Sequence, residues 1–503
     1  MKQKQTQFTF GVPAAERDED LYACFVSSDI YANLRDGRKT IILGNRGSGK
    51  SALFRMLADE EVNRGSLVIA LAPEEYSYEL LSVTMKKEAQ GSWAKQGAYS
   101  AAWKYLIYIL VMKEITKKGK HLKKGAEASI YSYLRDNHAG TDTNPVGMMV
   151  SYLKRMEGLK IGQYEAAIRA RELKKLYSLE EIDPLIPKID EVAGSRRIFV
   201  FVDELDKGWD SSEDAMAFVA GLFHAALAIN ERLDNVRVLV SLRRELYDNI
   251  PALYEDAQKV RDIIETIQWD ETSLLELIGR RIARRLPELT GLSFEARWNA
   301  VFAETLEYRQ TRSFNYVVDR TLYRPREIIQ FCNDIAETAH RQITISAEPF
   351  NYRQVAEAEY AYSEARLKDI CSEYRFQYPG LQSVLETFRG GVYTFTRAEL
   401  EEHLLRVVVK DLPVDKDASS WCEDVEPETI LDILWKVGFL RAQAVGGIRA
   451  RRRSGSSYLG SHQIGSLNLR NLQRFHVHPM FRSYLGMKES KREPNKANED
   501  DEE

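Results

Sequence analysis

The chain has 503 residues, which at about 150 residues per domain predicts about three domains, each large enough to bury a core. With 44% apolar and 29% charged residues, the composition is typical of globular proteins and excludes disulfide miniproteins, fibrous proteins and disordered chains. Lys and Arg number 71 and Asp and Glu number 75, so the formal net charge of −4 gives no sign of a nucleic-acid binder. Any basic surface has to be local.

The cysteines and the apolar stretches indicate a cytoplasmic protein. No C-x-x-C pair occurs, which argues against a zinc site and fits a reducing compartment; the four cysteines are Cys24, Cys332, Cys371 and Cys422. Residues 1–7 lack the apolar core of a signal peptide. The most hydrophobic stretch, Tyr105–Met112, is far shorter than the ~20 residues that cross a bilayer. We therefore expect no membrane association.

Four apolar runs have the length and composition of β-strands. The first begins at Lys39 and is followed by glycines and by the helix-compatible stretch Ala52–Ala58. The other three are Ser66–Leu71, Ile198–Val202 and Val236–Leu242. Because long helical segments join these runs, they predict an α/β fold with a parallel sheet covered on both faces.

The spacing of these runs and the later helical periodicity predict the domains. About 125 residues separate the second and third strands, more than one crossover helix needs. Near the C-terminus, a helix from Pro427 to Gly438 is followed by strands at 439–440 and 475–477, joined by a long loop, which is typical of a winged helix. We expect a core over 1–270 with a helical insertion over about 75–190, a helical lid over 271–345, a winged-helix-like domain over 346–489 and a disordered acidic tail over 490–503.

The segment Gly44–Ser51 matches G-x-x-x-x-G-K-[ST] and lies between a predicted strand and a predicted helix. Its glycines let backbone N–H groups approach phosphate oxygens, and the helix N-terminus adds partial positive charge. Lys50 is expected to reach the β- and γ-phosphates, and the Ser51 hydroxyl to ligate Mg²⁺. We therefore predict ATP and Mg²⁺ as cofactors, with a nucleotide cradle made of Gly44, Asn45, Arg46, Gly47, Ser48, Gly49, Lys50, Ser51 and Ala52.

The apolar strand at 199–202 ends in two adjacent carboxylates, Asp203 and Glu204. Asp203 is predicted to hold Mg²⁺, and Glu204 to orient or deprotonate the attacking water. An acid at this position favours hydrolysis over binding alone.

Two arginine positions have alternative interpretations. Arg243 ends a predicted strand that also carries Ser241, where its guanidinium would contact the γ-phosphate. Alternatively, Arg243 and Arg244 are solvated and pair with Glu245 or Asp248. Pro325 and Arg326 either contribute a lid arginine that contacts nucleotide or form an ordinary helix start with proline in its first turn.

These elements together resemble additional-strand P-loop ATPases of the AAA+ and STAND type, closest to initiator-like ATPases. More narrowly, the chain resembles a poorly characterised bacterial family of P-loop ATPases that is often associated with defence. The resemblance rests on Gly44–Ser51 and Asp203-Glu204, and on five further phrases: Phe10-Gly11 with Ala15–Asp18, Asp203–Trp209, Leu242–Leu246, Arg324–Glu327 and His478–Arg482.

The resemblance implies roles for residues outside the two motifs. It places Ser241 as a polar sensor, Arg243 as a phosphate-contacting arginine, Pro325 and Arg326 where a lid meets nucleotide, and the segment 10–17 near adenine. It also implies a nucleotide-controlled switch, frequently encoded in antiphage or mobile-element neighbourhoods. The chain departs from the pattern because it has no obvious trans-acting arginine finger and no fused effector, so a separately encoded effector protein is expected.

The C-terminal region contains a local excess of positive charge. Residues 433–488 include ten Lys or Arg and no Asp or Glu. The predicted wing carries Arg449, Arg451, Arg452 and Arg453, which are candidates for contacts with DNA phosphates. A solvated loop paired with acids elsewhere is the alternative. The stripe Arg280, Arg281, Arg284 and Arg285 is expected to bridge to nearby acids.

We conclude from the sequence that the chain is a Mg²⁺-dependent ATPase in which Glu204, Lys50 and Arg243 carry the chemistry. The leading hypothesis is a switch that regulates a partner protein, plausibly in antiphage defence, with possible homo-oligomerisation. A DNA-binding initiator- or repair-type ATPase and a nucleotide-stabilised scaffold with little turnover are the alternatives.

Overall fold

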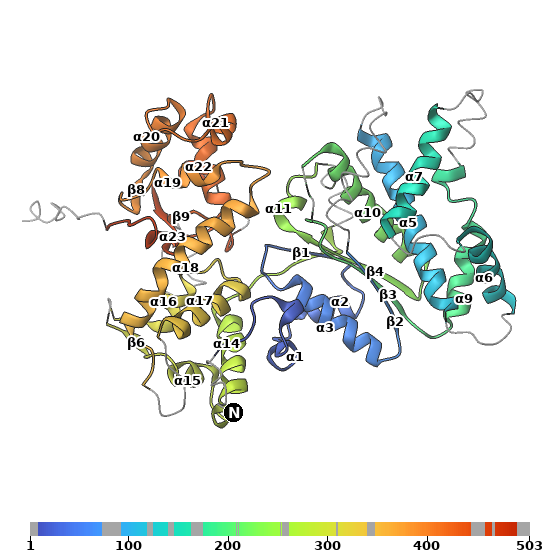
Figure 1. Cartoon of the computed structure of the whole chain (residues 1–503), viewed down its shortest axis with the longest axis horizontal. Coiled ribbons are helices and arrows are strands. Elements are labelled where there is room, and N and C mark those ends of the chain that lie inside the picture. Colours follow the sequence, from blue (N-terminus) through green and yellow to red (C-terminus); the bar gives the residue numbers. More distant parts are fainter. Residues whose placement is uncertain are drawn as a thin grey trace, which may run out of the picture. The chain divides into compact units, whose positions relative to one another are not determined.

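The computed structural model describes residues 9–72, 92–117, 124–138, 145–161, 175–207, 209, 211–251, 253, 261–307, 310–339, 348–443, 458–464 and 468–489. The chain divides into two compact units (Figure 1). The core unit is Ser27–Gln268, and the helical unit combines Met1–Val26 with Trp269–Glu503. The core unit is therefore inserted between two parts of the helical unit.

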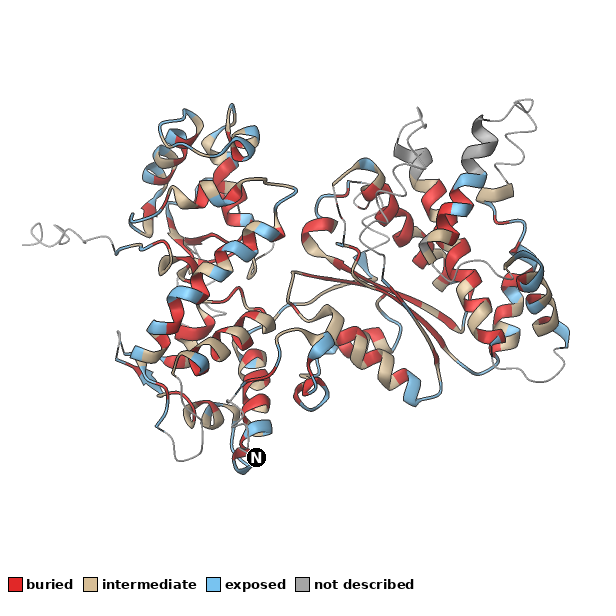
Figure 2. Cartoon of the chain, in the orientation of Figure 1, coloured by how far each residue is buried: buried red, intermediate tan, exposed pale blue. Residues whose placement is uncertain are grey.

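The core unit contains a five-stranded parallel sheet in the order β2-β3-β4-β1-β5. Its strands are β1 (Ile41–Gly44), β2 (Leu67–Leu71), β3 (Ile198–Val202), β4 (Val236–Arg243) and β5 (Ile264–Thr266). The four expected strands and the parallel α/β fold are confirmed, and β5 is an addition. Figure 2 shows the central strands buried along their length, as expected for a sheet covered on both faces.

Helices cover both faces of this sheet (Figure 1). One face carries α2 (Asp29–Arg35) and α3 (Lys50–Asn63), and the other carries α5 (Ser92–Thr116) and α10 (Glu213–Arg232). The insertion is helical, as expected, and adds α6 (Gly125–His138), α7 (Pro145–Ile161) and α9 (Ile186–Ala193). Its apolar residues belong to the same buried cluster as the sheet, so the insertion completes the core of this unit.

The range expected as the lid, 271–345, contains α14 (Glu271–Arg285), α15 (Phe294–Asn299), α16 (Ser313–Val318) and α17 (Pro325–Thr338). Two helices from outside that range, α1 (Leu21–Cys24) and α18 (Tyr352–Glu373), pack with them. Asp270 and Ser273 form a capping box that begins α14, and this helix ends before Pro287. A short hairpin of β6 (Thr305–Leu306) and β7 (Thr311–Arg312) interrupts the helices and was not expected.

The C-terminal part has the winged-helix-like arrangement that the sequence predicts. Its antiparallel sheet runs β10-β9-β11-β8. The elements are α19 (Leu381–Glu386), β8 (Thr394–Thr396), α20 (Arg397–Val408), α21 (Lys416–Cys422), α22 (Pro427–Lys436), β9 (Leu440–Gln443), β10 (Tyr458–Leu459), β11 (Arg474–Val477) and α23 (Pro479–Arg482). The strands β8 and β10 extend the expected two-stranded hairpin.

Residues 444–457, which include the arginines of the predicted wing, and the tail at 490–503 lie outside the described residues. Within the ranges that the structure describes, no helix is both long and apolar enough to cross a membrane.

Candidate functional site

The motif Gly44–Ser51 forms a tight loop between β1 and α3. Gly47 and Gly49 have φ angles of 79° and 98°, in the left-handed region that favours glycine. A Cβ on Gly44 would lie 2.4 Å from the Ser48 hydroxyl oxygen, so the backbone closes tightly on itself. The first N–H groups of α3 have no partner within the helix, which suits this N-terminus to binding an anion.

Lys50 is the first residue of α3, and its side chain folds over the loop. The ammonium donates to the carbonyl oxygens of Gly44 at 2.8 Å and Asn45 at 3.1 Å. Burial lowers the pKa of this ammonium, while the negative charges of Glu245 and Asp203 act in the opposite direction. The cation is thus fixed inside the glycine-rich loop.

The register of the sheet brings two further expected site residues to the same edge as the loop. Gly44 of β1 lies opposite Arg243 of β4, and Val202 of β3 lies opposite Val240 of β4. Asp203 therefore follows β3 beside Ser241, whose hydroxyl donates to the Asp203 Oδ1 atom at 2.6 Å. The carboxyl ends of three adjacent strands carry the loop, the carboxylate and the arginine.

Glu204 makes a sharp turn directly after Asp203. Its φ angle is 60°, which is unfavourable for a residue with a side chain by about 1 kcal/mol. Its backbone N–H donates to Asp203 Oδ1 at 2.8 Å, and its side chain forms an ion pair with Lys207 at 2.7 Å. The turn directs the two adjacent carboxylates to different partners.

Arg243 and Arg244 have different environments, although they are adjacent in sequence. The Arg243 guanidinium forms ion pairs with Asp206 and, at 3.7 Å, with Glu245, and its side chain is 18% exposed. Arg244 pairs with the half-exposed Asp248 at 3.6 Å. The two arginines pair with the acids named by the second interpretation, Glu245 and Asp248, but Arg243 is mostly buried rather than solvated.

The expected lid residues belong to the helical unit. Pro325 is the first residue of α17 and Arg326 the second, so they begin a helix as the second interpretation expected. The buried arginine at this point is their neighbour Arg324, which forms ion pairs with Glu373 at 2.8 Å and Glu327 at 3.6 Å. Arg324 therefore anchors the start of α17 within its own unit.

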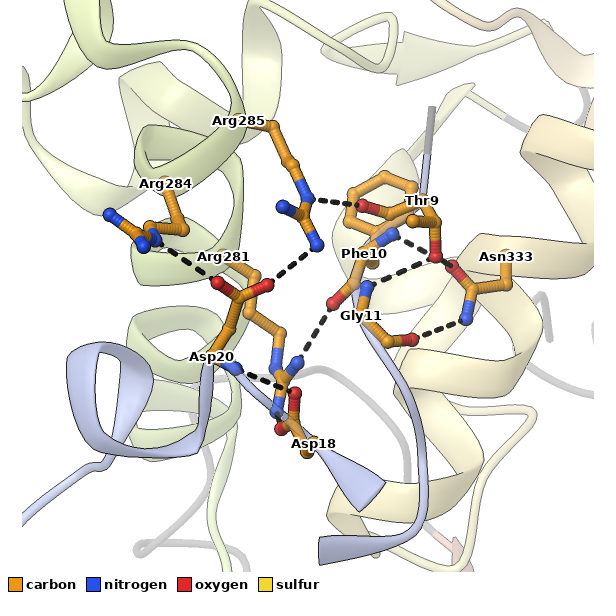
Figure 3. A network of polar contacts seen from close by, with 9 residues as sticks. All are labelled: Thr9, Phe10, Gly11, Asp18, Asp20, Arg281, Arg284, Arg285 and Asn333. Carbon is orange, nitrogen blue, oxygen red and sulfur yellow. Dashed lines mark hydrogen bonds and ion pairs between the residues drawn. The ribbon is translucent and has the colours of Figure 1, made fainter. Parts of the chain in front are cut away.

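An N-terminal strap, residues 9–20, is fastened to α14 by arginines (Figure 3). Arg281 forms a buried ion pair with Asp18 at 2.5 Å and donates to the Phe10 carbonyl at 2.9 Å. Asp20 pairs with Arg284 at 3.0 Å and with Arg285 at 2.6 Å. The expectation that the basic stripe bridges to nearby acids is confirmed; its fourth member, Arg280, pairs with Glu276 at 2.7 Å.

The strap is also held from α17. The Asn333 side chain accepts from the Phe10 N–H at 2.8 Å and donates to the Gly11 carbonyl at 2.9 Å (Figure 3). Gly11 has a φ of 98°, and a Cβ there would lie 2.2 Å from the Arg281 Nη1 atom. These contacts explain why residues up to Val26, expected in the core region, pack with the helical unit instead.

The basic C-terminal segment divides into buried and exposed cations. Arg441 is buried and forms an ion pair with Asp319 at 3.3 Å, and Arg482 donates to the Val477 carbonyl at 2.7 Å. Arg470 and Arg474 are exposed. The expected DNA-contacting residues Arg449, Arg451, Arg452 and Arg453 lie outside the described residues.

Sequence reasoning missed Asp206 and Lys207 as partners of the site, whereas Glu245 was expected as a partner of an arginine. Asp206 and Lys207 lie in the phrase Asp203–Trp209, which was noted only as a recurring phrase. The acidic residues and the lysine that follow β3 were a signal for ion pairing. The choice of partner, however, depends on which strand of the sheet lies next to β3.

The chain is similar to known proteins, to some over part of its length and to others over most of it. Residues 272–371, from α14 into α18, match the family described as the FunZ-associated C-terminal helical domain. The chain is 22% identical over 501 residues to the transposon gamma-delta 80.3 kDa protein of Escherichia coli (strain K12), covering 97% of this chain and 68% of that protein. It is 27% identical over 140 residues to Allergen Alt a 2 of Alternaria alternata, covering 27% of this chain and 70% of that protein. Among solved structures, the Aeropyrum pernix ORC2 protein in ADPNP and ADP complexes is similar over 96% of this chain and 94% of that chain, with a TM-score of 0.35 and 11% identity.

Proposed function

We propose that the chain is a Mg²⁺-dependent ATPase that acts as a nucleotide-controlled switch. One observation carries the proposal: the carboxyl ends of β1, β3 and β4 bring together a glycine-rich loop with its lysine, an Asp-Glu pair and an arginine. In open parallel sheets this edge is where ligands bind. The chemical groups suit a polyphosphate, which needs backbone N–H donors and cations, and a hard metal ion, which needs oxygen ligands.

The residues present fit both ATP and Mg²⁺. The closely folded loop and the N-terminus of α3 supply N–H donors, and Lys50 supplies a fixed cation. The Ser51 hydroxyl and the Asp203 carboxylate are the oxygen donors that Mg²⁺ prefers. The metal, when bound, neutralises charge on the β- and γ-phosphates.

Each side chain has a defined task in this proposal. Ser241 orients Asp203 through its 2.6 Å hydrogen bond. Glu204 positions and deprotonates the attacking water once its carboxylate leaves Lys207. Arg243 contacts the terminal phosphate, and loss of that phosphate is relayed to the partner surface. Pro325 and Arg326 are proposed to contribute from the lid.

The steady-state ATPase rate of the purified chain tests the proposal. We expect Mg²⁺-dependent turnover that Lys50→Ala abolishes through loss of nucleotide binding. Glu204→Gln should retain binding and lose about 10²–10³-fold in rate, because the general base is removed. Arg244→Gln, which changes an arginine outside the site, is the matched control. Binding without any turnover in the parent chain would favour the scaffold, and absence of nucleotide binding would refute the proposal.

The biological role is proposed to be regulation of a separately encoded effector, plausibly in antiphage defence. The relative encoded by a transposon supports a place among genes of mobile elements. Nucleotide-dependent homo-oligomerisation is part of this proposal, and light scattering with ADP and with an uncleavable ATP analogue tests it. An unchanged mass in both nucleotides would remove oligomerisation from the mechanism.

Contact with DNA is a second candidate, favoured by the winged-helix-like sheet and by the exposed Arg470 and Arg474, just before and at the start of β11. The helix before the wing, α22, argues for contact through the wing only, because its N-cap Glu426 is exposed and Asp432 within it is partly exposed. Phosphate contacts predict salt-dependent binding of duplex DNA that weakens when Arg470 and Arg474 are changed to Ala. If binding does not depend on salt and is unchanged in these variants, the wing is excluded as the surface that contacts DNA.

A further inference from the structure

The ion pair between Arg243 and Asp206 links two strands at the edge of the proposed nucleotide site. Arg243 ends β4 opposite Gly44, the first residue of the glycine-rich loop. Asp206 follows β3 by four residues, in the same turn as Asp203 and Glu204. The arginine therefore lies beside the loop and is already bound to a protein carboxylate.

The segment that carries Asp206 is anchored. Leu205 is 1% exposed and belongs to the buried cluster of the core unit. The Asp203 carboxylate is held by Ser241, and the Glu204 side chain is held by Lys207. Because Leu205 before Asp206 and Trp209 after it are both buried in the core unit, Asp206 holds Arg243 in a defined place rather than following it.

An incoming anion must compete with protein carboxylates for Arg243. Three carboxylates, those of Asp203, Asp206 and Glu245, lie around the cations of Lys50 and Arg243. The charges of the other four residues all act on the pKa of Lys50. A terminal phosphate offers oxygens that match the planar guanidinium fork as well as a carboxylate does. ATP has such a phosphate next to the loop, and ADP lacks it.

We propose that Asp206 is a positioning residue that competes with the terminal phosphate of ATP for Arg243, and so sets the preference of the site for ATP over ADP. The inference rests on the proposed nucleotide-binding function. Its consequence is a threshold: the arginine leaves its carboxylate only when the third phosphate is present, which separates the two nucleotide states of the switch.

Calorimetric titration with Mg²⁺ and either ADP or an ATP analogue with an uncleavable β–γ bond tests this competition. Asp206→Asn keeps the size of the side chain and removes its charge. We expect the Kd of the ATP analogue to fall about tenfold, an effect of the size expected for a partly desolvated ion pair, with the Kd of ADP unchanged. A residue needed only for folding would weaken both ligands equally.

Three further variants complete the test. Asp248→Asn, which breaks the neighbouring Arg244 pair by the same chemical change, should leave both Kd values unchanged. Asp206→Glu should restore the parent ratio. Asp206→Asn combined with Arg243→Ala should show no more preference for the ATP analogue than Arg243→Ala alone. If Asp206→Asn does not fold, Asp206→Ser makes the same removal of charge.

The outcomes distinguish the role of Asp206 from the proposed nucleotide-binding function. An unchanged ratio of the two Kd values in folded Asp206→Asn, with normal binding by the parent chain, overturns the role of Asp206 and leaves the proposed function intact. A folded parent chain that binds neither nucleotide refutes the proposed function, and the role of Asp206 falls with it.

Discussion

Asp18 and Arg281 form the most buried ion pair of the strap, with side chains 3% and 5% exposed. Removing one partner of such a pair leaves the other charge buried, which costs about 3–5 kcal/mol. We expect Asp18→Ala to lower the free energy of unfolding of the helical unit by about 3 kcal/mol, measured by urea denaturation. Arg312→Ala is the control, since it breaks an exposed pair with Glu295 and should cost no more than about 0.5 kcal/mol. Equal effects of the two changes would contradict the structural role of the strap.

His403 makes the stability of the helical unit depend on pH. Burial, aided by Arg406, lowers the pKa of its imidazole from 6.5 to about 4. The folded state then binds this proton less readily than the unfolded state. Its contribution is fully present above pH 6.5 and is lost as the pH falls from 6.5 towards 4.

We expect unfolding free energies measured at pH 7 and pH 5 to differ more in the parent chain than in His403→Gln, by about 1–2 kcal/mol. Glutamine can still donate to the Thr387 hydroxyl, which the imidazole Nε2 approaches at 3.0 Å. His476, whose pKa burial lowers to about 3, is present in both proteins and cancels in the comparison. The same loss of unfolding free energy between pH 7 and pH 5 in both proteins would show that His403 does not titrate in this pH range.

At the residue scale, the sequence predicted which residues lie together in the candidate site, but not all of their partners. Gly44–Ser51 and Asp203-Glu204 are recognisable because each is a local pattern whose chemistry depends on adjacent residues. The pairing of Arg243 with Asp206 depends on β3 and β4 lying side by side in one register. A single sequence does not specify that register, so solvation remained an alternative for Arg243.

At the scale of elements, helices α5 and α10 approach closely at Gly221. A Cβ there would lie 2.8 Å from the Ser100 nitrogen and from the Tyr99 Cβ. Alanine is the better helix former by about 1 kcal/mol, so a stabilised protein is expected if the helices can separate. We expect the opposite sign, a loss of about 1–3 kcal/mol from overpacking, measured by thermal or urea denaturation.

Gly97→Ala in α5 is the matched control. A Cβ at this position makes an ordinary contact of 3.4 Å with Tyr177, so the change should be neutral or stabilising. If both alanines stabilise the chain, the close approach of α5 and α10 is not what selects glycine at 221.

Elements were predicted well where they are long or end at glycine, and poorly where they are short. The helix from Pro427 and the strands on either side of the wing were expected, because Gly438, with a φ of 86°, marks the helix end. The three-residue strands β5 and β8 were missed. Such runs are too short for alternation to be visible, and they exist as strands only through pairing with β1 and β11.

At the scale of the whole molecule, the two units predict two unfolding transitions in calorimetry. Mg²⁺ with an uncleavable ATP analogue at 100 times its Kd should stabilise the core unit by about 2.7 kcal/mol, because binding favours the folded state. Lys50→Ala should remove the shift of that transition. A single transition, or an equal shift of both, would mean that the units unfold as one.

The strap described above also sets an order of events during synthesis. Its residues are synthesised before their partners, because Arg281 and Asn333 follow 271 and 323 residues after Phe10. At about 5–20 residues per second, Phe10 and Asp18 wait on the order of 15–60 s for α14 and α17. The core unit is synthesised within that interval, so the strap closes onto the helical unit only after the sheet encoded between them has been made.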